Sequence, residues 1–191
     1  MSIALRRPKM SLEEFLDWES QQELRWEFDG FEPVAMVGTT LRHNEIIGNV
    51  FLALRQRLGG RCRVYREGVR LRMAHTLRYP GVMVVCSRYP DTATWVTDPV
   101  VVFEVLSEST SKTDRIAKTL EYQATSSIQT YVLLEQDVVA ATVLRRSGQN
   151  WTTSVLLRDD MLTLAEIEIA VPVAEFYAGL DLEHESGSTS A

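Results

Sequence analysis

Apolar residues recur at helical spacing in several parts of this chain of 191 residues. The longest such pattern ends at Gly59-Gly60, where a helix is expected to stop. Ser11, followed three residues later by Glu14, has the capping-box pattern of a helix start, and Pro172 suits the first turn of a closing helix. The predicted helices span 11–19, 41–58, 113–124 and 172–180.

Shorter apolar runs between turn residues predict strands. Asp29-Gly30 is the strongest short-range hairpin signal, and apolar stretches flank it on both sides. The continuous apolar runs at 82–86 and 100–106 are typical of strands buried on both faces. The remaining predicted strands are 25–28 and 31–36 around that turn, 62–67 and 69–73 around Gly68, 130–134, and a late hairpin of 138–145 and 151–157.

Strands with helices between them predict an α/β (α+β) fold in which helices flank a mixed sheet. The length suits one domain with a sizeable core and is too short for two ordinary domains. We therefore expect a flexible N-terminus over 1–10, a single domain over 11–180 and a disordered, Ser/Glu/Gly-rich tail over 181–191.

Composition and cysteine content indicate the class of protein and its expected compartment. Hydrophobic residues make up 45% and charged residues 24%, as in soluble globular proteins. No apolar run approaches the ~20 residues of a membrane-spanning helix, so no membrane partner is expected. Cys62 and Cys86 have neither zinc spacing nor the pattern of a disulfide framework, and Cys86 is expected to be a buried small hydrophobe. A cytoplasmic location follows as the expectation.

Charge is distributed unevenly along the chain. The net charge is −6, yet eight arginines and one acid, Glu67, lie between Arg55 and Arg78. One interpretation is a solvated arginine face. The other is a weak nucleic-acid-binding surface, because arginine binds phosphate in a bidentate manner. Its candidate residues are Arg61, Arg63, Arg66, Arg70 and Arg72.

Three charged residues stand in unusual surroundings. Glu104 lies within the apolar run 100–106, where a carboxylate costs several kcal/mol unless a cation, a metal or hydrogen-bond donors compensate it. Glu27 lies between Trp26 and Phe28, and Lys118 shares a helix face with Asp114 and Tyr122. Structural alternatives remain open: a strand-end glutamate, a solvent-facing hairpin residue and a surface Asp–Lys pair.

The histidines do not form a hydrolytic zinc motif. His43 and His75 lack HxH or HExxH spacing, so zinc hydrolysis is not indicated. His43, near a helix start, is expected to be structural or to act as a helix cap. The chain also lacks GxSxG, a Walker loop and the dinucleotide-binding glycine pattern.

Several strings together resemble a known family. In chain order they are Met10-Ser11-Leu12-Glu13-Glu14-Phe15, Trp26-Glu27-Phe28-Asp29-Gly30, Arg42-His43-Asn44, Arg78-Tyr79-Pro80, Phe103 to Thr110, and Asp114 through Lys118 to Tyr122. This succession, spread over Met10 to Leu180, resembles the Uma-type family of bacterial restriction endonucleases in the PD-(D/E)XK superfamily. The resemblance implies a restriction-endonuclease-like core preceded by a helix and a hairpin.

The resemblance also implies a site and an activity. Glu27 and Glu104 would be active-site acids and metal ligands, and Lys118 would be the catalytic lysine, placed on a helix. The implied reaction is hydrolysis of DNA phosphodiester bonds with Mg²⁺ or Mn²⁺, which polarises the phosphate and generates hydroxide while the lysine stabilises developing charge. Double-stranded DNA is the implied partner, and a homodimer is left open.

One position departs from the family pattern. An aspartate is expected after Tyr79-Pro80 as a principal metal ligand, facing the metal beside Glu104, but the chain has Gly81. Loss of a carboxylate lowers affinity for a hard cation, so Mg²⁺ binding should be weak or absent unless another acid compensates. Asp91 and Glu67 are the candidate substitutes.

Three classes of function therefore stay open. The first is a metal-dependent endonuclease impaired at Gly81. The second is a catalytically inactive nucleic-acid-binding or regulatory module with the nuclease fold, and the third is an interaction protein with structural buried acids. Metal binding separates the first from the others, and salt-sensitive DNA binding separates the second from the third.

Overall fold

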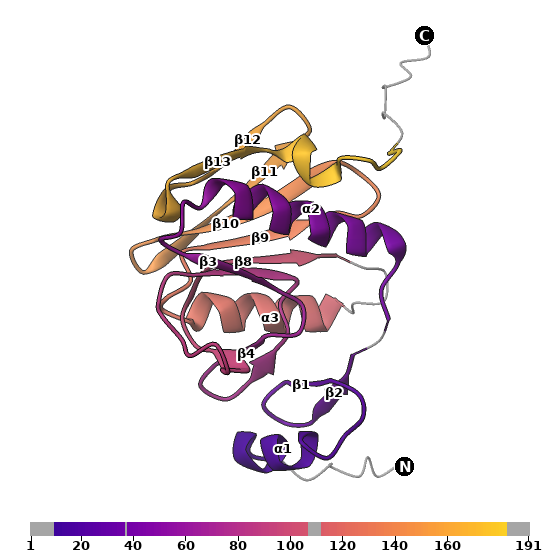
Figure 1. Cartoon of the computed structure of the whole chain (residues 1–191), viewed down its shortest axis with the longest axis vertical. Coiled ribbons are helices and arrows are strands. Elements are labelled where there is room, and N and C mark those ends of the chain that lie inside the picture. The colour runs from indigo at the N-terminus through magenta and orange to yellow at the C-terminus, as the bar shows by residue number, and fades with distance from the viewer. Residues whose placement is uncertain (1–9, 37, 107–111, 183–191) are drawn as a thin grey trace, which may run out of the picture.

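A six-stranded mixed sheet forms the centre of the computed structural model, which describes residues 10–36, 38–106 and 112–182 (Figure 1). Strands β8 and β9 run parallel and are joined through helix α3, whereas the other neighbours are antiparallel. In spatial order the strands are β11 (Asn150–Leu157), β10 (Ala140–Ser147), β9 (Thr130–Leu134), β8 (Pro99–Val105), β6 (Val82–Val85) and β3 (Arg63–Arg66).

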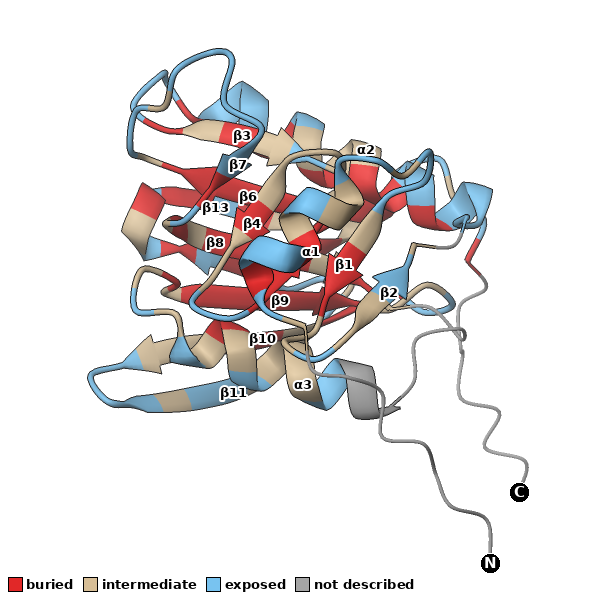
Figure 2. Ribbon diagram, turned by 90° about the horizontal axis from the view of Figure 1, so that it is seen from below, coloured by how far each residue is buried: buried red, intermediate tan, exposed pale blue. Residues whose placement is uncertain are grey.

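Helices cover both faces of this sheet. Helix α2 (Leu41–Arg57) packs against one face, on a cluster that includes Val101 and Phe103. Helix α3 (Lys112–Ala124) lies on the other face, where Tyr122 joins the cluster that contains Val102. Figure 2 shows β6, β8 and β9 as buried strands between these layers. The predicted mixed sheet flanked by helices is confirmed.

A second, five-stranded sheet carries the N-terminal part of the chain. Helix α1 (Leu12–Glu19) begins with the predicted capping box at Ser11 and Glu14, and Phe15 stacks on Phe28 with ring centroids 5.0 Å apart. The predicted hairpin at Asp29-Gly30 is confirmed: Asp29 Oδ1 accepts from two backbone N–H groups of the turn. The strand order is β2 (Pro33–Ala35), β1 (Trp26–Phe28), β5 (Leu77–Arg78), β4 (Arg70–Arg72) and β7 (Trp95–Val96).

The strands predicted around Gly68 belong to different sheets. Strand β3 pairs with β6 in the central sheet, whereas β4 pairs with β5 and β7 in the second sheet. Gly68 has φ of +108°, a conformation that favours glycine and redirects the chain between the sheets. Both segments around Gly68 are strands as predicted, but the alternation of apolar and polar residues does not show which strand each one pairs with.

The closing helix expected over 172–180 is wrong in type and extent. Pro172 ends strand β13 (Ile169–Pro172), which pairs with β12 (Met161–Leu164); the short 3₁₀ helix η1 (Ala165–Ile167) connects them. Only a 3₁₀ helix, η2 (Val173–Tyr177), follows. Its buried residues 173, 176 and 177 have helical spacing, but Ala178 has an extended ψ of 133° and ends the turn.

The expectation that the cysteines form no disulfide is also wrong. Cys62 and Cys86 are bonded to each other, with an S–S distance of 2.00 Å. Pairing of Arg63 with Val85 places residue 62, just before β3, opposite residue 86, just after β6. Cys86 is half-buried, and Cys62 is buried. The pairing of β3 with β6 brings the two cysteines together, and the spacing of the cysteines in the sequence does not show that pairing.

The expectations about the termini fall largely outside the described residues, since positions 1–9 and 183–191 are not described. Among the helices that the structure describes, none is long and apolar enough to cross a membrane.

Candidate functional site

Glu104 lies near the end of β8, with its carboxylate on the α3 side of the central sheet. The neighbouring Phe103 points to the α2 side, as strand alternation requires. Tyr122 Oη donates to Glu104 Oε1 at 2.8 Å, and the Gly81 backbone N–H donates to Oε2 at 3.3 Å. The strand therefore fixes the direction of the carboxylate, and two donors fix its rotamer.

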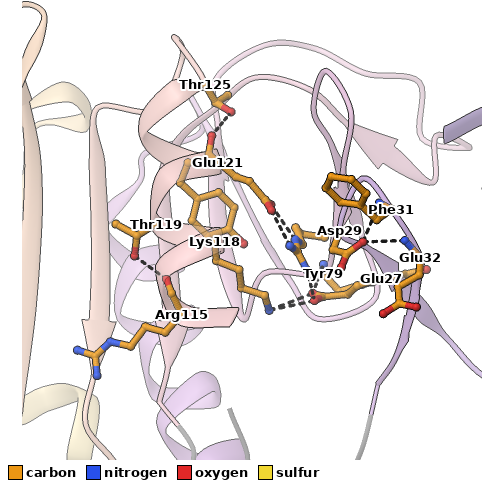
Figure 3. A network of polar contacts seen from close by, with 12 residues as sticks. Glu27, Asp29, Phe31, Glu32, Tyr79, Arg115, Lys118, Thr119, Glu121 and Thr125 are labelled. Carbon is orange, nitrogen blue, oxygen red and sulfur yellow. Dashed lines mark hydrogen bonds and ion pairs between the residues drawn. The ribbon is translucent and has the colours of Figure 1, made fainter. Parts of the chain in front are cut away.

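Lys118 links the two acids that the sequence singles out. From α3, its Nζ lies 3.0 Å from Glu27 Oε2 and 3.9 Å from Glu104 Oε1. Figure 3 shows Lys118 and Glu121 extending from α3 towards Glu27 and Tyr79. Three residues separated by up to 91 positions thus meet at one place, between α3 and the edge of the second sheet.

Glu27 is not a solvent-facing hairpin residue, because it is only 6% exposed. Its Oε1 accepts from the Tyr79 backbone N–H at 3.0 Å, and its Oε2 accepts from Arg78 Nη1 at 3.2 Å. Pairing of Phe28 with Leu77 brings β1 beside β5 and so positions both donors. Cations and backbone donors compensate the buried carboxylate on several sides.

Arg78 and Glu121 complete the network and were not recognised as site residues from the sequence. Arg78 is fully buried and donates to Glu121 from Nε at 2.8 Å and from Nη2 at 2.6 Å. The sequence places Arg78 at the end of an arginine-rich segment and in the string Arg78-Tyr79-Pro80, neither of which assigns it a role in the site. No local signal marks it, because burial of an arginine depends on acids that come from β1 and α3.

The two central carboxylates have opposite pKa shifts. Burial alone would raise the pKa of Glu27, but Lys118, Arg78 and the Tyr79 N–H outweigh burial and hold it below its ordinary value. Burial raises the pKa of Glu104 despite the opposing charge of Lys118, and the charge of Glu27 adds to the rise. Such a divergent pair of acids is typical of sites where the two carboxyls take different roles in proton exchange.

Tyr122 stays protonated beside Glu104. Burial and the Glu104 charge raise the pKa of its phenol well above the ordinary value. The hydroxyl therefore acts as a hydrogen-bond donor over the physiological pH range. The sequence placed Tyr122 on the face of Lys118, and the structure adds its contact with Glu104.

Gly81 offers the site a backbone N–H and no room for a side chain. A Cβ at this position would lie 2.4 Å from Ile47 Cδ1 and 3.2 Å from the Phe103 carbonyl oxygen. The sequence predicted that a side chain at 81 would face the metal. This prediction is wrong, because the Cβ points at the packed α2 side. An aspartate here would cost stability unless Ile47 shifts.

The acids present form an incomplete Mg²⁺ centre. Glu27 is surrounded by two cations, and residue 81 supplies no carboxylate. Among the described residues, no group of three Asp, Glu, His or Cys side chains is placed to hold one ion. Mg²⁺ is usually held by one or two carboxylates together with waters and substrate phosphate, and of the two acids here Glu27 is already paired with Arg78 and Lys118.

The two candidate substitutes lie in different settings. Asp91 pairs with Arg63 at 3.0 Å, and its side chain is 89% exposed. Glu67 lies beside the Gly81 segment, since its backbone N–H donates to the Gly81 carbonyl at 3.1 Å. Its Oε1 lies 3.9 Å from Nδ1 of His43. Of the two acids, Glu67 is therefore the one joined to the Gly81 segment by a hydrogen bond.

His43 lies in the first turn of α2. Thr40 is the N-cap of α2, and its hydroxyl accepts a hydrogen bond from the His43 backbone N–H at 3.1 Å. His43 is therefore not the helix cap. Burial lowers the pKa of His43 against the opposing effect of Glu67. His75 is exposed.

The five candidate nucleic-acid-binding arginines are largely engaged with the protein itself. Arg61, Arg63, Arg70 and Arg72 pair with Glu168, Asp91, Glu19 and Glu13, respectively. The exposed Arg66 lies over the Phe51 ring, with Cζ 5.4 Å from its centroid. Phosphate binding by these arginines stays a prediction, and ion pairing would compete with it at four of the five positions.

Comparisons with known proteins give one consistent result. A family model named Uma2, "Putative restriction endonuclease", matches residues 12–174. Two uncharacterized proteins of Synechocystis sp., slr1290 and sll1609, are 29% and 27% identical over 91% and 89% of this chain and 94% and 98% of their own lengths.

A solved structure shows the same fold. The crystal structure of a protein titled a "putative nuclease belonging to DUF820" from Anabaena variabilis matches with a TM-score of 0.74. The match covers 88% of this chain and 97% of that chain at 17% identity, so it supports the arrangement of elements and not the residues of the site. It is consistent with the predicted restriction-endonuclease-like core.

Proposed function

The chain belongs to the Uma2 family of restriction endonucleases, and on this premise we propose that it is a DNA endonuclease with impaired Mg²⁺-dependent phosphodiester hydrolysis. Nucleases of this kind usually use divalent metal ions and act on nucleic acid. The proposal extends to double-stranded DNA as substrate, a cytoplasmic location and a homodimer, in which two sites would cut two strands.

The contact of Lys118 with both Glu27 and Glu104 is the observation that carries the proposal. The two carboxylates already hold the Lys118 ammonium group in place, so substrate binding costs little further side-chain entropy. In this role Lys118 stabilises the negative charge that develops on a phosphate, Glu104 acts as the proton-exchanging acid and Glu27 positions the lysine. Arg78 in turn holds Glu27.

The crowding at Gly81 favours a second candidate, a DNA-binding module without catalysis. A Cβ at 81 would lie 2.4 Å from Ile47 Cδ1, so this chain supplies neither the expected ligand nor unobstructed space for it. The charged network around Arg78 is buried and internally satisfied, which suits a structural role as well as a catalytic one. Cleavage and binding assays distinguish the two candidates.

Nicking of supercoiled plasmid in Mg²⁺ or Mn²⁺ is the direct test. We expect slow nicking by the wild-type protein, loss of nicking in Glu104→Gln and Lys118→Met, and no change in Glu23→Gln, which removes an exposed acid away from the network. Wild-type nicking that persists in both site variants would contradict the assignment. Salt-sensitive DNA binding without any nicking would instead establish the binding module.

A further inference from the structure

We propose that His43 and Glu67 form a binding site for a divalent transition-metal ion of the kind that accepts imidazole, such as Zn²⁺, Co²⁺, Ni²⁺ or Mn²⁺. The site lies at the start of α2, next to the Gly81 segment. It is separate from the Glu27–Lys118–Glu104 network, and its ion binding can be measured without DNA. It therefore stands or falls independently of the nuclease proposal.

His43 Nδ1 is the observation that points to a ligand. His43 is 9% exposed, and its Nδ1 is buried with no hydrogen-bond partner among the described residues. A buried polar atom without a partner costs about 1–3 kcal/mol, so native proteins rarely keep one without a reason such as an unseen ion or water. The nearby Glu67 carboxylate, at 3.9 Å, supplies negative charge on the same side.

The separation of the two atoms favours an ion over a direct hydrogen bond or a bridging water. A distance of 3.9 Å is too long for a hydrogen bond. A water hydrogen-bonded to both atoms at ~2.8 Å would leave them roughly 4.6 Å apart if its angle were near tetrahedral. Two ligands of a tetrahedral ion, each at ~2.0–2.2 Å, lie roughly 3.4 Å apart. Glu67, whose side chain is 31% exposed, can close the remaining half ångström or so by a small rotation.

One tautomer of His43 suits metal binding. The Val105 backbone favours the protonated imidazole, against the larger opposing effect of burial on the pKa of His43. Nδ1 has no partner within the described ranges, so its lone pair is available to an ion when the ring proton is on Nε2. A histidine ligand commonly donates its other ring N–H to a carbonyl, which fixes the ring and strengthens the ligand.

The backbone holds both side chains in place. The Thr40 hydroxyl caps the turn that carries His43, and the Glu67 N–H donates to the Gly81 carbonyl. A bound ion would therefore lie beside the position where the family pattern expects an aspartate. With two protein ligands, the other coordination positions are open to water or to a phosphate oxygen, so the affinity should be modest.

The choice of ion follows from the ligand types. Imidazole with one carboxylate suits Zn²⁺, Co²⁺, Ni²⁺ and Mn²⁺, whereas Mg²⁺ binds oxygen ligands and rarely imidazole. The proposed site therefore differs in ligand chemistry from the Mg²⁺ centre that the family resemblance implies at Glu27 and Glu104. Millimolar Mg²⁺ should not displace the bound ion.

Cobalt binding to the tag-free full chain tests the site, measured by the visible absorption of Co²⁺ and by calorimetry with Zn²⁺. We expect wild-type binding, with affinity reduced at least tenfold in His43→Asn and in Glu67→Gln. His75→Asn and Glu23→Gln, which change exposed residues of the same types, should stay within twofold of wild type. Circular dichroism verifies the fold of each variant, and the half-exposed Glu67 provides a readout even if His43→Asn unfolds.

Four outcomes would overturn the proposal. The first is the absence of Co²⁺ and Zn²⁺ binding by the wild-type protein up to millimolar concentration. The second is binding that Glu67→Gln leaves unchanged, and the third is binding that His75→Asn weakens as much as His43→Asn does. Displacement of Co²⁺ by equimolar Mg²⁺ would likewise reject an imidazole-containing site.

Discussion

Arg78 binds Glu121 through two parallel hydrogen bonds, of 2.8 Å from Nε and 2.6 Å from Nη2, while its third nitrogen reaches Glu27. One fully buried guanidinium thereby joins α3 to β1 across the site. Because Glu27 also holds Lys118, the geometry of the candidate catalytic lysine depends on an arginine that would not contact substrate.

Replacing Arg78 by methionine should destabilise the fold strongly. The change removes the buried cation of Glu121 and one of the two cations of Glu27, and breaking such a pair from one side costs about 3–5 kcal/mol. Urea denaturation measures the loss. The matched control is Arg61→Met, which breaks an exposed pair with Glu168 and should cost less than about 1 kcal/mol. Equal effects of the two substitutions would show that the Arg78 network does not support the fold.

Gly81→Asp should destabilise the protein and fail to restore Mg²⁺-dependent nicking by itself. The added Cβ meets Ile47 Cδ1, and Ile47→Val removes that atom at a cost of about 0.5–1.5 kcal/mol. We therefore expect the aspartate to cost less free energy of unfolding in the Ile47→Val background than in wild type. The comparison is a double-mutant cycle in urea. If the cost is the same in both backgrounds, Ile47 is not the obstacle.

Stability near Glu104 should depend on pH in a defined direction. Its folded-state pKa lies above the ordinary value, so the folded protein binds the proton more tightly than the unfolded chain does. The contribution of Glu104 is therefore fully present below the unfolded-state pKa and is lost as pH rises through the folded-state pKa.

Glu104→Gln removes that titration and keeps an acceptor for Tyr122. We expect the variant to gain stability relative to wild type as pH rises above the unfolded-state glutamate pKa of about 4 and through the higher folded-state pKa. Glu27, whose pKa is lowered, has the opposite sign: its stabilising contribution is present above the unfolded-state pKa and is lost as pH falls through the folded-state pKa. Denaturation curves at several pH values provide the measurement. A constant difference between Glu104→Gln and wild type would refute the raised pKa.

Arg66 should contribute more to DNA binding than Arg61. Arg66 is exposed and lies over the Phe51 ring, with no acidic partner in the ranges described, whereas Arg61 is paired with Glu168. Each phosphate contact contributes about 0.9 to the slope of log affinity against log salt. We expect Arg66→Ala to lower the slope by about this amount and Arg61→Ala to change it little. Fluorescence anisotropy over a salt series measures both, and equal slopes would argue against phosphate contact at Arg66.

The sequence by itself determined most helices and strands, and it showed that charged site residues stand in apolar surroundings. Hydrophobic spacing predicted helix α2, the buried strands β6 and β8 and the hairpin at Asp29-Gly30, because these depend on local periodicity and turn chemistry. Glu104 was recognisable because a carboxylate in an apolar strand needs compensation. These properties depend only on residues that are close together in the sequence.

Only the tertiary structure decided which partners those residues have. Strand pairing placed Cys62 opposite Cys86 and assigned the strands around Gly68 to different sheets, since alternation fixes the faces of a strand but not its neighbour. Burial of Arg78 required carboxylates from two other elements. The crowding at Gly81 arises from Ile47 on α2, a contact between packed layers that no local pattern encodes.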